Sequence, residues 1–417
     1  TVDEVADALR RLPNREVMAV RQLALPPSEQ EALHADAAGA ANPYSRMPVH
    51  DNSMFFGRAA ELERISEWLH NSVPCIWLRG QKRVGKTSLM LHLRRDFWEP
   101  HDAVCAYVDF QRLNNPAQAN IFYEVALAVY TDLQRDPRIT ALGAPDRTLF
   151  ESIPSLRLQG YLRDVQQRLG TRRLVILIDE FSRITDLYLG GHISGDFFWQ
   201  WRSLLQGSER YCSFITVVQQ KTFEHMRHHV VTHPDDPCWH VLELGDTLYL
   251  KPFSPEDARR LVEWPMRNFM DYAPGGVEQV IALTGGSPFL IQAFCNKLVT
   301  QLSREGTRSA EAQDIEVVAE EFMQPSESIF AHLLDQAPGF ADHICTRAAL
   351  LCEEAATTFG AAVFSWESLC AALPDVAADT LRNTLARLSD ADILPSPAEG
   401  QWRFNRRLFQ RWLALHS

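Results

Sequence analysis

The sequence predicts a three-layer α/β domain built on a parallel sheet, followed by a helical subdomain and a small C-terminal module. Short apolar runs alternate with helical patterns over residues 51–253; the runs are VPCIWLRG, AVCAYVDF, RLVILIDE, CSFITVVQ and DTLYLKPF. Runs this apolar indicate central strands that helices cover on both faces. Their alternation with helices is typical of a parallel α/β sheet.

After Phe253 we expect the strands to stop and a helical lid subdomain to follow. Ser254 and Pro255 precede Glu256 and Asp257. This order gives a capping serine, a proline at the first helical position and acids in the first turn. The predicted helices of the lid span 255–264, 276–283, 288–303 and 313–323.

The final part of the chain has a different pattern. We expect helices near 339–354, 366–373 and 377–390, a hairpin in ILPSPAEGQWRF and a closing helix in RRLFQRWLAL. Helices followed by a hairpin and a closing helix are typical of a winged-helix module. The predicted division is a lead-in or linker at 1–50 with one helix candidate (Val5–Leu12), a sheet domain at 51–253, the lid at 254–336 and the winged helix at 337–417.

Composition limits the class of protein. The chain has 417 residues, 46% of them apolar and 23% charged, which is typical of a globular protein with several domains. Its formal charge of −12 argues against broad coating of nucleic acid. Eight scattered cysteines without a Cys-x-x-Cys pair indicate reduced thiols in a cytoplasmic protein.

The sequence also bears on location. We find no apolar run long enough to cross a bilayer and no signal peptide, so we expect no membrane partner. The first residue is Thr. We therefore expect a processed or trimmed chain, or the C-terminal part of a longer protein.

Residues Gly80–Thr87 match the phosphate-binding pattern G-x-x-x-x-G-K-[ST], between an apolar run and an amphipathic helix. The glycines let successive backbone N–H groups point at phosphates, and the helix adds its positive N-terminal dipole. Lys86 is expected to reach the β- and γ-phosphates, and the Thr87 hydroxyl to bind Mg²⁺. The sequence thus predicts a P-loop nucleotide-binding fold. We expect ATP or ADP with Mg²⁺ to contact Gly80, Gln81, Lys82, Arg83, Val84, Gly85, Lys86, Thr87 and Ser88.

Two acids end the apolar run LVILIDE, downstream of the phosphate loop. We expect Asp179 to hold Mg²⁺ together with Thr87, and Glu180 to polarise the attacking water. The next run, CSFITVVQQ, ends in Gln219 and Gln220, either of which is a candidate to contact the γ-phosphate or orient water. A simple strand cap is an equally good interpretation of these glutamines. These motifs predict an ATPase.

With these motifs on the chain, residues 42–417 resemble the STAND-type P-loop ATPases, signalling relatives of the AAA+ proteins. The segment NPYSRMPVHDNSMFFGRAAELERI (42–65) is similar to the one before the first strand in that family, where an FFGR-like turn borders the adenine. The resemblance therefore places Phe56 and Arg58 at the adenine. TGGSPFLIQ (284–292) is similar to the G-x-P motif, whose proline, here Pro288, packs near the adenine. ESIFAHLLDQ (327–336) resembles the helix that joins the lid to the winged helix.

One position departs from the origin-recognition-type AAA+ ATPases, which place a sensor arginine where this chain has Pro288. This departure favours slow, nucleotide-controlled switching over fast hydrolysis in a ring. Arg227 is our candidate arginine finger, and Arg202 and Arg210 compete with it. For each one alone, a solvated surface arginine is the favoured interpretation.

The resemblance implies an ADP-bound closed form that opens and oligomerises when ATP replaces ADP. Such a switch requires that the γ-phosphate bind one arrangement better than the other. The expected partners are further copies of the chain and an effector or sensor protein, fused upstream or separate, in bacterial defence or signalling. The alternatives are a DNA-handling AAA+ ATPase of the origin-recognition or transposition-helper kind, and a scaffold that holds ATP without hydrolysing it.

Two further segments have competing interpretations. WRFNRRLFQRWLALHS carries arginines that suit a DNA-contacting wing and helix, but its apolar residues also form a core face, and the net charge favours that second interpretation. Its arginines are Arg403, Arg406, Arg407 and Arg411, and its apolar residues are Phe404, Leu408, Phe409, Trp412 and Leu413. In EHMRHHVVTHPDDPCWH (224–240) we favour solvated loop histidines over a metal site.

Overall fold

The computed structural model describes residues 42–416, apart from 51, 96–101, 114–115, 207–210, 221, 225, 227–228, 230–232, 234, 324–328, 331–332, 334–340 and 355–362. The predicted lead-in helix, Arg210, Arg227 and most of the predicted connecting helix at 327–336 therefore lie outside the described residues.

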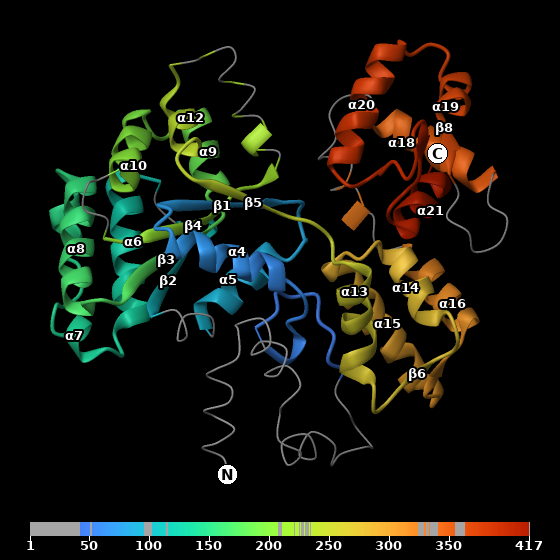
Figure 1. Cartoon of the computed structure of the whole chain (residues 1–417), viewed down its shortest axis with the longest axis horizontal. Helices are drawn as coiled ribbons and strands as arrows, with labels where there is room; N and C mark the ends of the chain where they lie inside the picture. Colours follow the sequence, from blue (N-terminus) through green and yellow to red (C-terminus); the bar gives the residue numbers. More distant parts are fainter. Residues whose placement is uncertain are drawn as a thin grey trace.

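A parallel sheet forms the centre of the first domain, as the apolar runs predicted (Figure 1). Its strands lie in the order β2-β3-β4-β1-β5 and every neighbouring pair is parallel. The chain runs from β1 to the far edge at β2, returns through β3 and β4, and then crosses to the other side of β1. The carboxyl ends of β1 and β4 thus meet at a change of direction, where open α/β sheets bind ligands. The strands are β1 (Cys75–Gly80), β2 (Ala103–Asp109), β3 (Arg173–Asp179), β4 (Ser213–Val217) and β5 (Asp246–Leu250).

Two separate cores show that both faces of this sheet are covered. In β1, Ile76 and Leu78 pack into one core, whereas Cys75 and Trp77 pack into the other. The first core is closed by α4 (Ala59–His70) and α5 (Lys86–Arg95). Helices on the opposite face close the second core; they are α6 (Gln118–Leu133), α8 (Pro154–Leu169), α9 (Ser182–Leu189), α10 (Asp196–Gln206) and α12 (Pro237–Leu242). This arrangement confirms the three-layer fold class.

Shorter elements complete the described part of the sheet domain. The helix α7 spans Pro137–Thr140, and 3-10 turns span Asn52–Met54, Phe110–Arg112 and Arg147–Phe150. None of the described helices combines the length and the apolar composition that spanning a bilayer requires.

The lid contains α13 (Pro255–Glu263), α14 (Gly276–Thr284), α15 (Pro288–Glu305) and α16 (Ala312–Met323), with a 3-10 turn at Trp264–Met266. Its first helix begins as expected, because the Ser254 side chain accepts a hydrogen bond from the Asp257 backbone N–H at 3.1 Å. The expectation that strands stop after Phe253 is wrong, because β6 (Asp271–Tyr272) pairs with β7 (Ser309–Ala310) in parallel. Strands of two residues carry no periodic signal, and their pairing depends on the packing of the helices around them.

The C-terminal module contains α18 (Ala341–Glu354), α19 (Trp366–Ala372), α20 (Ala378–Asp390) and α21 (Arg407–Leu415). The predicted hairpin differs in its partner: β9 (Gln401–Trp402) pairs antiparallel with β8 (Phe364–Ser365), which precedes α19. Within ILPSPAEGQWRF a bridge joins Ala398 and Gln401. The apolar residues of α21 share one core with the lid helices, and Figure 1 shows the module, in red, above the lid. The core-face interpretation of the C-terminal segment is therefore confirmed.

Candidate nucleotide-binding site

The phosphate loop connects β1 to α5 and depends on left-handed backbone at three positions. Gly80, Arg83 and Gly85 have φ values of 149°, 68° and 97°. A Cβ on Gly80 would lie 2.7 Å from the Leu250 carbonyl oxygen of β5, so this position requires glycine. The loop curls around Lys86, the first residue of α5.

Lys86 is buried at the centre of the loop. Its Nζ donates hydrogen bonds to the carbonyl oxygens of Gly80 at 2.9 Å and Gln81 at 2.8 Å. Burial lowers its pKa to about 8, while the carboxylates of Glu180 and Asp179 act in the opposite direction. An ammonium group buried in this way favours an anionic ligand at the loop.

Asp179 ends β3 beside the start of α5. Its carboxylate accepts hydrogen bonds from the Tyr107 hydroxyl at 3.1 Å and the Glu180 backbone N–H at 3.0 Å. Burial raises the pKa of Asp179, and the nearby Thr87 hydroxyl opposes that rise. The structure therefore brings together Thr87 and Asp179, the two residues predicted to hold Mg²⁺. A hydroxyl and a carboxylate are hard oxygen donors, and Mg²⁺ commonly takes few protein ligands beside phosphate and water. The residues thus fit this ion.

Glu180 is held in position by the neighbouring strand. It has a left-handed backbone with φ 55°, and its carboxylate accepts a hydrogen bond from Gln219 Nε2 at 2.8 Å. The Gln219 backbone N–H in turn donates to the Ser182 hydroxyl at 2.8 Å. The second glutamine is placed elsewhere, because Gln220 bonds to Arg79 and Glu224. Of the two candidates, only Gln219 lines the cavity described next.

A cavity of about 360 Å³ joins these groups, and we call it the nucleotide cavity. The loop residues Lys82–Ser88 form one wall, with Glu180 and Gln219 beside them. Phe56, Arg58 and Pro288, which the resemblance assigned to the adenine, line the cavity as well. Arg58 also serves the loop itself, because its guanidinium donates to the Val84 and Lys251 carbonyl oxygens at 2.8 Å each and lies over the Phe253 ring.

A chain segment that was predicted only as the end of a linker crosses this cavity. Residues 45–49 line it, after an anchor in which the buried Tyr44 hydroxyl donates to the Val262 carbonyl oxygen of the lid at 2.6 Å. The Val49 backbone N–H donates to the Ser88 hydroxyl at 3.1 Å. We call residues 42–49 the strap, because they connect the lid to α5. Tyr44 and the prolines of NPYSRMP were the available signal, but they resemble the residues of an ordinary linker.

Other predicted residues that the structure describes do not line the nucleotide cavity. Arg202 bonds to Gln206 on its own helix and lies over Trp199. In the histidine-rich segment, His229 contacts Asp236. Among the residues that the structure describes, no group of three or more His, Cys, Asp or Glu side chains could hold a metal ion.

Comparisons with known proteins identify the fold. No protein-family model and no curated protein matches the sequence. Solved structures do match, among them a Walker-type ATPase of Pyrococcus abyssi, with a TM-score of 0.57 and 15% identity over 88% of this chain and 98% of that chain. The ORC2 protein of Aeropyrum pernix, solved as ADPNP–ADP complexes, matches with a TM-score of 0.54 and 14% identity over 89% and 99%. At these identities the likeness shows the fold: this chain has the fold of the Walker-type and origin-recognition P-loop ATPases. It does not distinguish the STAND subtype.

Proposed function

We propose that this chain binds Mg-ATP in the nucleotide cavity and hydrolyses it. One arrangement carries the proposal. The phosphate loop, the pair Thr87 and Asp179, and the pair Glu180 and Gln219 lie together at the ends of neighbouring strands. The fold supports it, because the solved structures named above are described as ATPase and as nucleotide complexes.

The residues have distinct tasks in this reaction. The loop N–H groups and Lys86 bind the phosphates, so that the ammonium exchanges its carbonyl partners for phosphate oxygens. Thr87 and Asp179 hold Mg²⁺, which neutralises charge on the phosphates when it is bound. Glu180 takes a proton from the attacking water, and Gln219 fixes the direction of its carboxylate.

We further propose that the nucleotide controls the position of the C-terminal module. Arg406 belongs to this module and is only 3% exposed. Its guanidinium donates a hydrogen bond of 2.8 Å to the Gln81 side chain of the phosphate loop. The same segment packs on the lid, since a Cβ on Gly285 would lie 2.5 Å from the Asn405 carbonyl oxygen. If the phosphate loop changes its conformation when one nucleotide replaces another, the hydrogen bond between Gln81 and Arg406 changes with it. This coupling supports a STAND-type switch that assembles with itself or with an effector or sensor protein.

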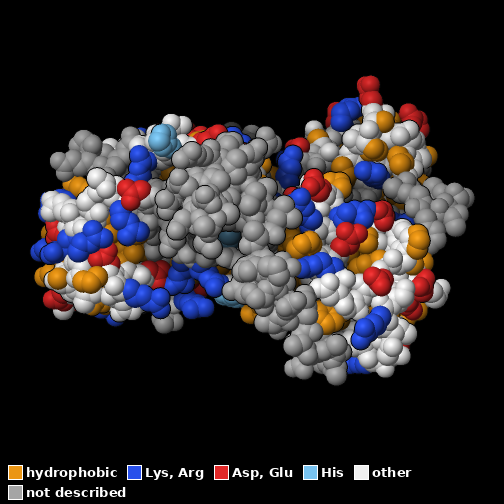
Figure 2. Space-filling model, turned by 60° about the horizontal axis from the view of Figure 1, so that its bottom comes forward, with side chains coloured by type: hydrophobic (Ala, Val, Ile, Leu, Met, Phe, Trp, Pro, Cys, Tyr) orange, Lys and Arg blue, Asp and Glu red, His pale blue; other side chains and the backbone are white. Residues whose placement is uncertain are grey.

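The second candidate is a DNA-handling ATPase of the origin-recognition kind. The likeness to ORC2 favours this candidate over the switch. Against it, Arg406 is buried and Arg411 pairs with Glu316 of the lid at 2.7 Å, which leaves Arg403 and Arg407 as the accessible arginines of the segment. On the face shown in Figure 2, basic and acidic side chains are intermixed over both the sheet domain and the lid.

Nucleotide binding tests the shared proposal. Titration with ATP and Mg²⁺ should show binding that Lys86→Ala weakens about a hundredfold, because two charge-assisted contacts to phosphate are lost. Lys297→Ala is the control, since Lys297 pairs with Glu321 on the lid surface. Equal binding by the Lys86→Ala protein would overturn the proposal.

Two measurements separate the candidates. Light scattering should show a larger assembly with a non-hydrolysable ATP analogue than with ADP if the chain is a switch. If it handles DNA, duplex binding should weaken with salt, and replacing Arg403 and Arg407 together should reduce the slope of log K against log salt by about 2. The DNA-handling candidate would be selected if the assembly had the same size with both nucleotides and if duplex binding weakened with salt as described.

A further inference from the structure

The strap bends at Arg46, where it passes the nucleotide cavity. On one side of this residue, the Ser45 backbone N–H donates to the Gln292 side chain of the lid at 3.1 Å. On the other side, the Met47 backbone N–H donates to the Ser45 hydroxyl at 3.1 Å. The backbone at Arg46 is therefore fixed from both directions. Its side chain starts from this fixed point and is one of those that line the cavity.

The strap brings to the cavity a cation that the lid does not supply. The described lid residues in the lining are uncharged; they are Leu261, Pro288, Phe289 and Gln292. The other charged residues of the described lining belong to the sheet domain; they are Arg58, Lys82, Arg83, Lys86 and Glu180. Among the described lining residues, Arg46 thus provides the positive charge that comes from outside the sheet domain.

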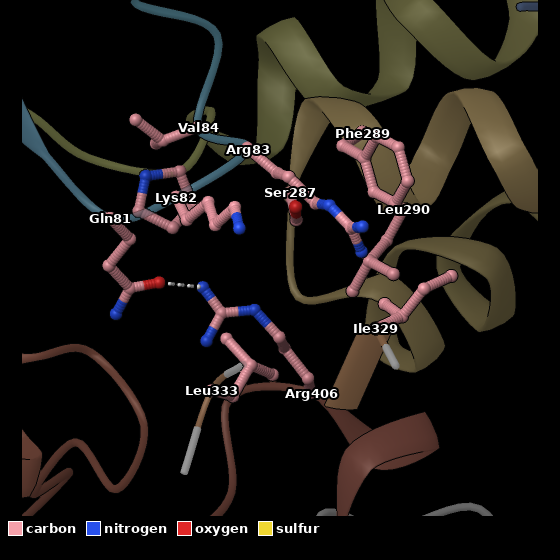
Figure 3. Close-up of a pocket in the computed structure, with 11 residues that line it drawn as sticks. Gln81, Lys82, Arg83, Val84, Ser287, Phe289, Leu290, Ile329, Leu333 and Arg406 are labelled. Carbon is pink, nitrogen blue, oxygen red and sulfur yellow. Dashed lines mark hydrogen bonds between the residues drawn. The ribbon is translucent and has the colours of Figure 1, made fainter. Parts of the chain in front are cut away.

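Arg83 of the phosphate loop lies close to this strap arginine. It lines the nucleotide cavity and also a second, smaller cavity where the loop, the lid and the C-terminal module meet. Figure 3 shows its side chain reaching from the loop to the lid beside Ser287 and Phe289. Burial lowers the pKa of Arg83, and the positive charge of Arg46 lowers it further. Two guanidinium groups that repel each other at one cavity favour an anion that contacts both.

The strap also places Arg46 near the end of the helix that holds phosphate. Val49 is bonded to Ser88, which follows Thr87 in the first turn of α5. Arg46 lies three residues before Val49, so their Cα atoms are at most about 11 Å apart. The N-terminus of a helix after a phosphate loop binds phosphate oxygens, and the long arginine side chain spans much of the remaining distance.

We propose that Arg46 binds the phosphate groups of the nucleotide from the side opposite the phosphate loop. The inference rests on the proposed binding of Mg-ATP and adds a binding residue that the sequence motifs do not contain. A guanidinium group suits this task, because its forked donors match two phosphate oxygens at once.

The contact acts on release of the nucleotide. The strap is bonded to the lid through Tyr44 and Ser45, so a phosphate held by Arg46 is covered by a segment with its own anchors. The nucleotide leaves only after this contact breaks, and the loss of such a contact appears mainly in the dissociation rate. Because Arg46 holds the phosphates equally before and during hydrolysis, it lowers KM and leaves kcat unchanged.

Replacement of Arg46 tests the inference. Arg46→Met should weaken Mg-ATP binding about tenfold, because a charge-assisted contact is lost while most of the apolar stem remains. KM should rise by the same factor at constant kcat. Arg46→Lys should weaken binding about threefold, since it keeps the charge but loses the fork. Without nucleotide, the Tm of Arg46→Met should equal or exceed that of the original protein, because repulsion of Arg83 is relieved.

Arg64→Met is the matched control, because this exposed arginine of α4 lies over Trp68 and does not line the cavity. It should leave Mg-ATP binding unchanged. Unaltered binding by Arg46→Met, equal loss with Arg64→Met, or a Tm of nucleotide-free Arg46→Met below that of the original protein would overturn the inference. If Lys86→Ala weakens binding while Arg46→Met does not, the inference alone fails. If the original protein takes up no ATP, the proposed function fails with it.

Discussion

The two cavities that share the phosphate loop are built in opposite ways. In the nucleotide cavity, the residues proposed to act on phosphate and water come from the loop and the ends of β3 and β4, which one parallel sheet holds together. The strap and the lid supply much of the remaining lining. The second cavity is lined by Gln81 and Arg83 of the loop, by lid residues such as Phe289, and by Arg406 of the C-terminal module. Arg406 lies 325 residues away from its partner Gln81 in the sequence. The proposed catalytic side of the first cavity therefore depends on the sheet, whereas the second cavity requires the loop, the lid and the C-terminal module to be packed together. Substitutions can therefore separate the proposed hydrolysis from the docking of the C-terminal module.

The sharpest test of the sheet-built cavity is Glu180→Gln. Phosphate release should fall about 10²–10⁴-fold while ATP binding is kept, because the amide cannot take a proton from water. Steady-state phosphate release and nucleotide titration measure the two properties. If phosphate release were unaltered, the chain would be a scaffold that holds ATP without hydrolysing it.

The contact between the lid and the C-terminal module is best disrupted at Gly285, which ends α14 with φ 61°. Gly285→Ala should lower the free energy of unfolding by about 3 kcal/mol, because strained backbone is combined with a clash against Asn405. Gly306→Ala is the matched control: this residue ends α15 with φ 71° and has open space around its Cβ position. We expect about 1 kcal/mol there. Urea unfolding compares the two, and equal losses would show that the contact with Asn405 contributes nothing.

A smaller effect distinguishes the two glutamines after β4. Gln219→Ala should slow phosphate release about tenfold, because Glu180 loses the hydrogen bond that directs its carboxylate. Gln220→Ala should leave the rate near that of the original protein, since this side chain bonds to Arg79 and Glu224. Equal rates in both variants would contradict the positioning role of Gln219.

The smallest expected effect is that of Tyr107→Phe. Removing the hydroxyl that donates to Asp179 should slow hydrolysis about threefold and raise the Mg²⁺ concentration needed for half-maximal rate. Tyr161→Phe removes a hydroxyl that bonds to the Gly143 carbonyl oxygen, away from the site. Titration of both variants with Mg²⁺ separates an effect on Asp179 from a general loss of stability.

The sheet-built half of the molecule could be predicted because its signals are local. A central parallel strand is apolar throughout, and a phosphate loop needs its glycines and lysine at fixed spacing, so β1, β3 and the residues from Gly80 to Thr87 are visible in the sequence. Asp179 and Glu180 follow from the same logic, since acids at the end of a buried strand have few structural uses.

The contacts of the C-terminal module could not be predicted, because their signals are not local. Arg406 lies in a basic segment in which an exposed arginine and a buried one give the same pattern. Its burial depends on Gln81 and Asp392, which are supplied by other elements after the chain has packed. The strands β6 and β7 have two residues each and likewise depend on long-range packing. Candidate residues at Arg227 and Arg210 lie outside the described structure.

The strap has a mechanical consequence. It is hydrogen-bonded at one end to α13 through Tyr44 and at the other to Ser88, the residue that follows Thr87. The six residues from Tyr44 to Val49, bonded at both ends, form a short tether. Rotation of the lid therefore either breaks the tyrosine anchor or pulls on the first turn of α5, so the lid acts as a lever on the residue next to the proposed magnesium ligand.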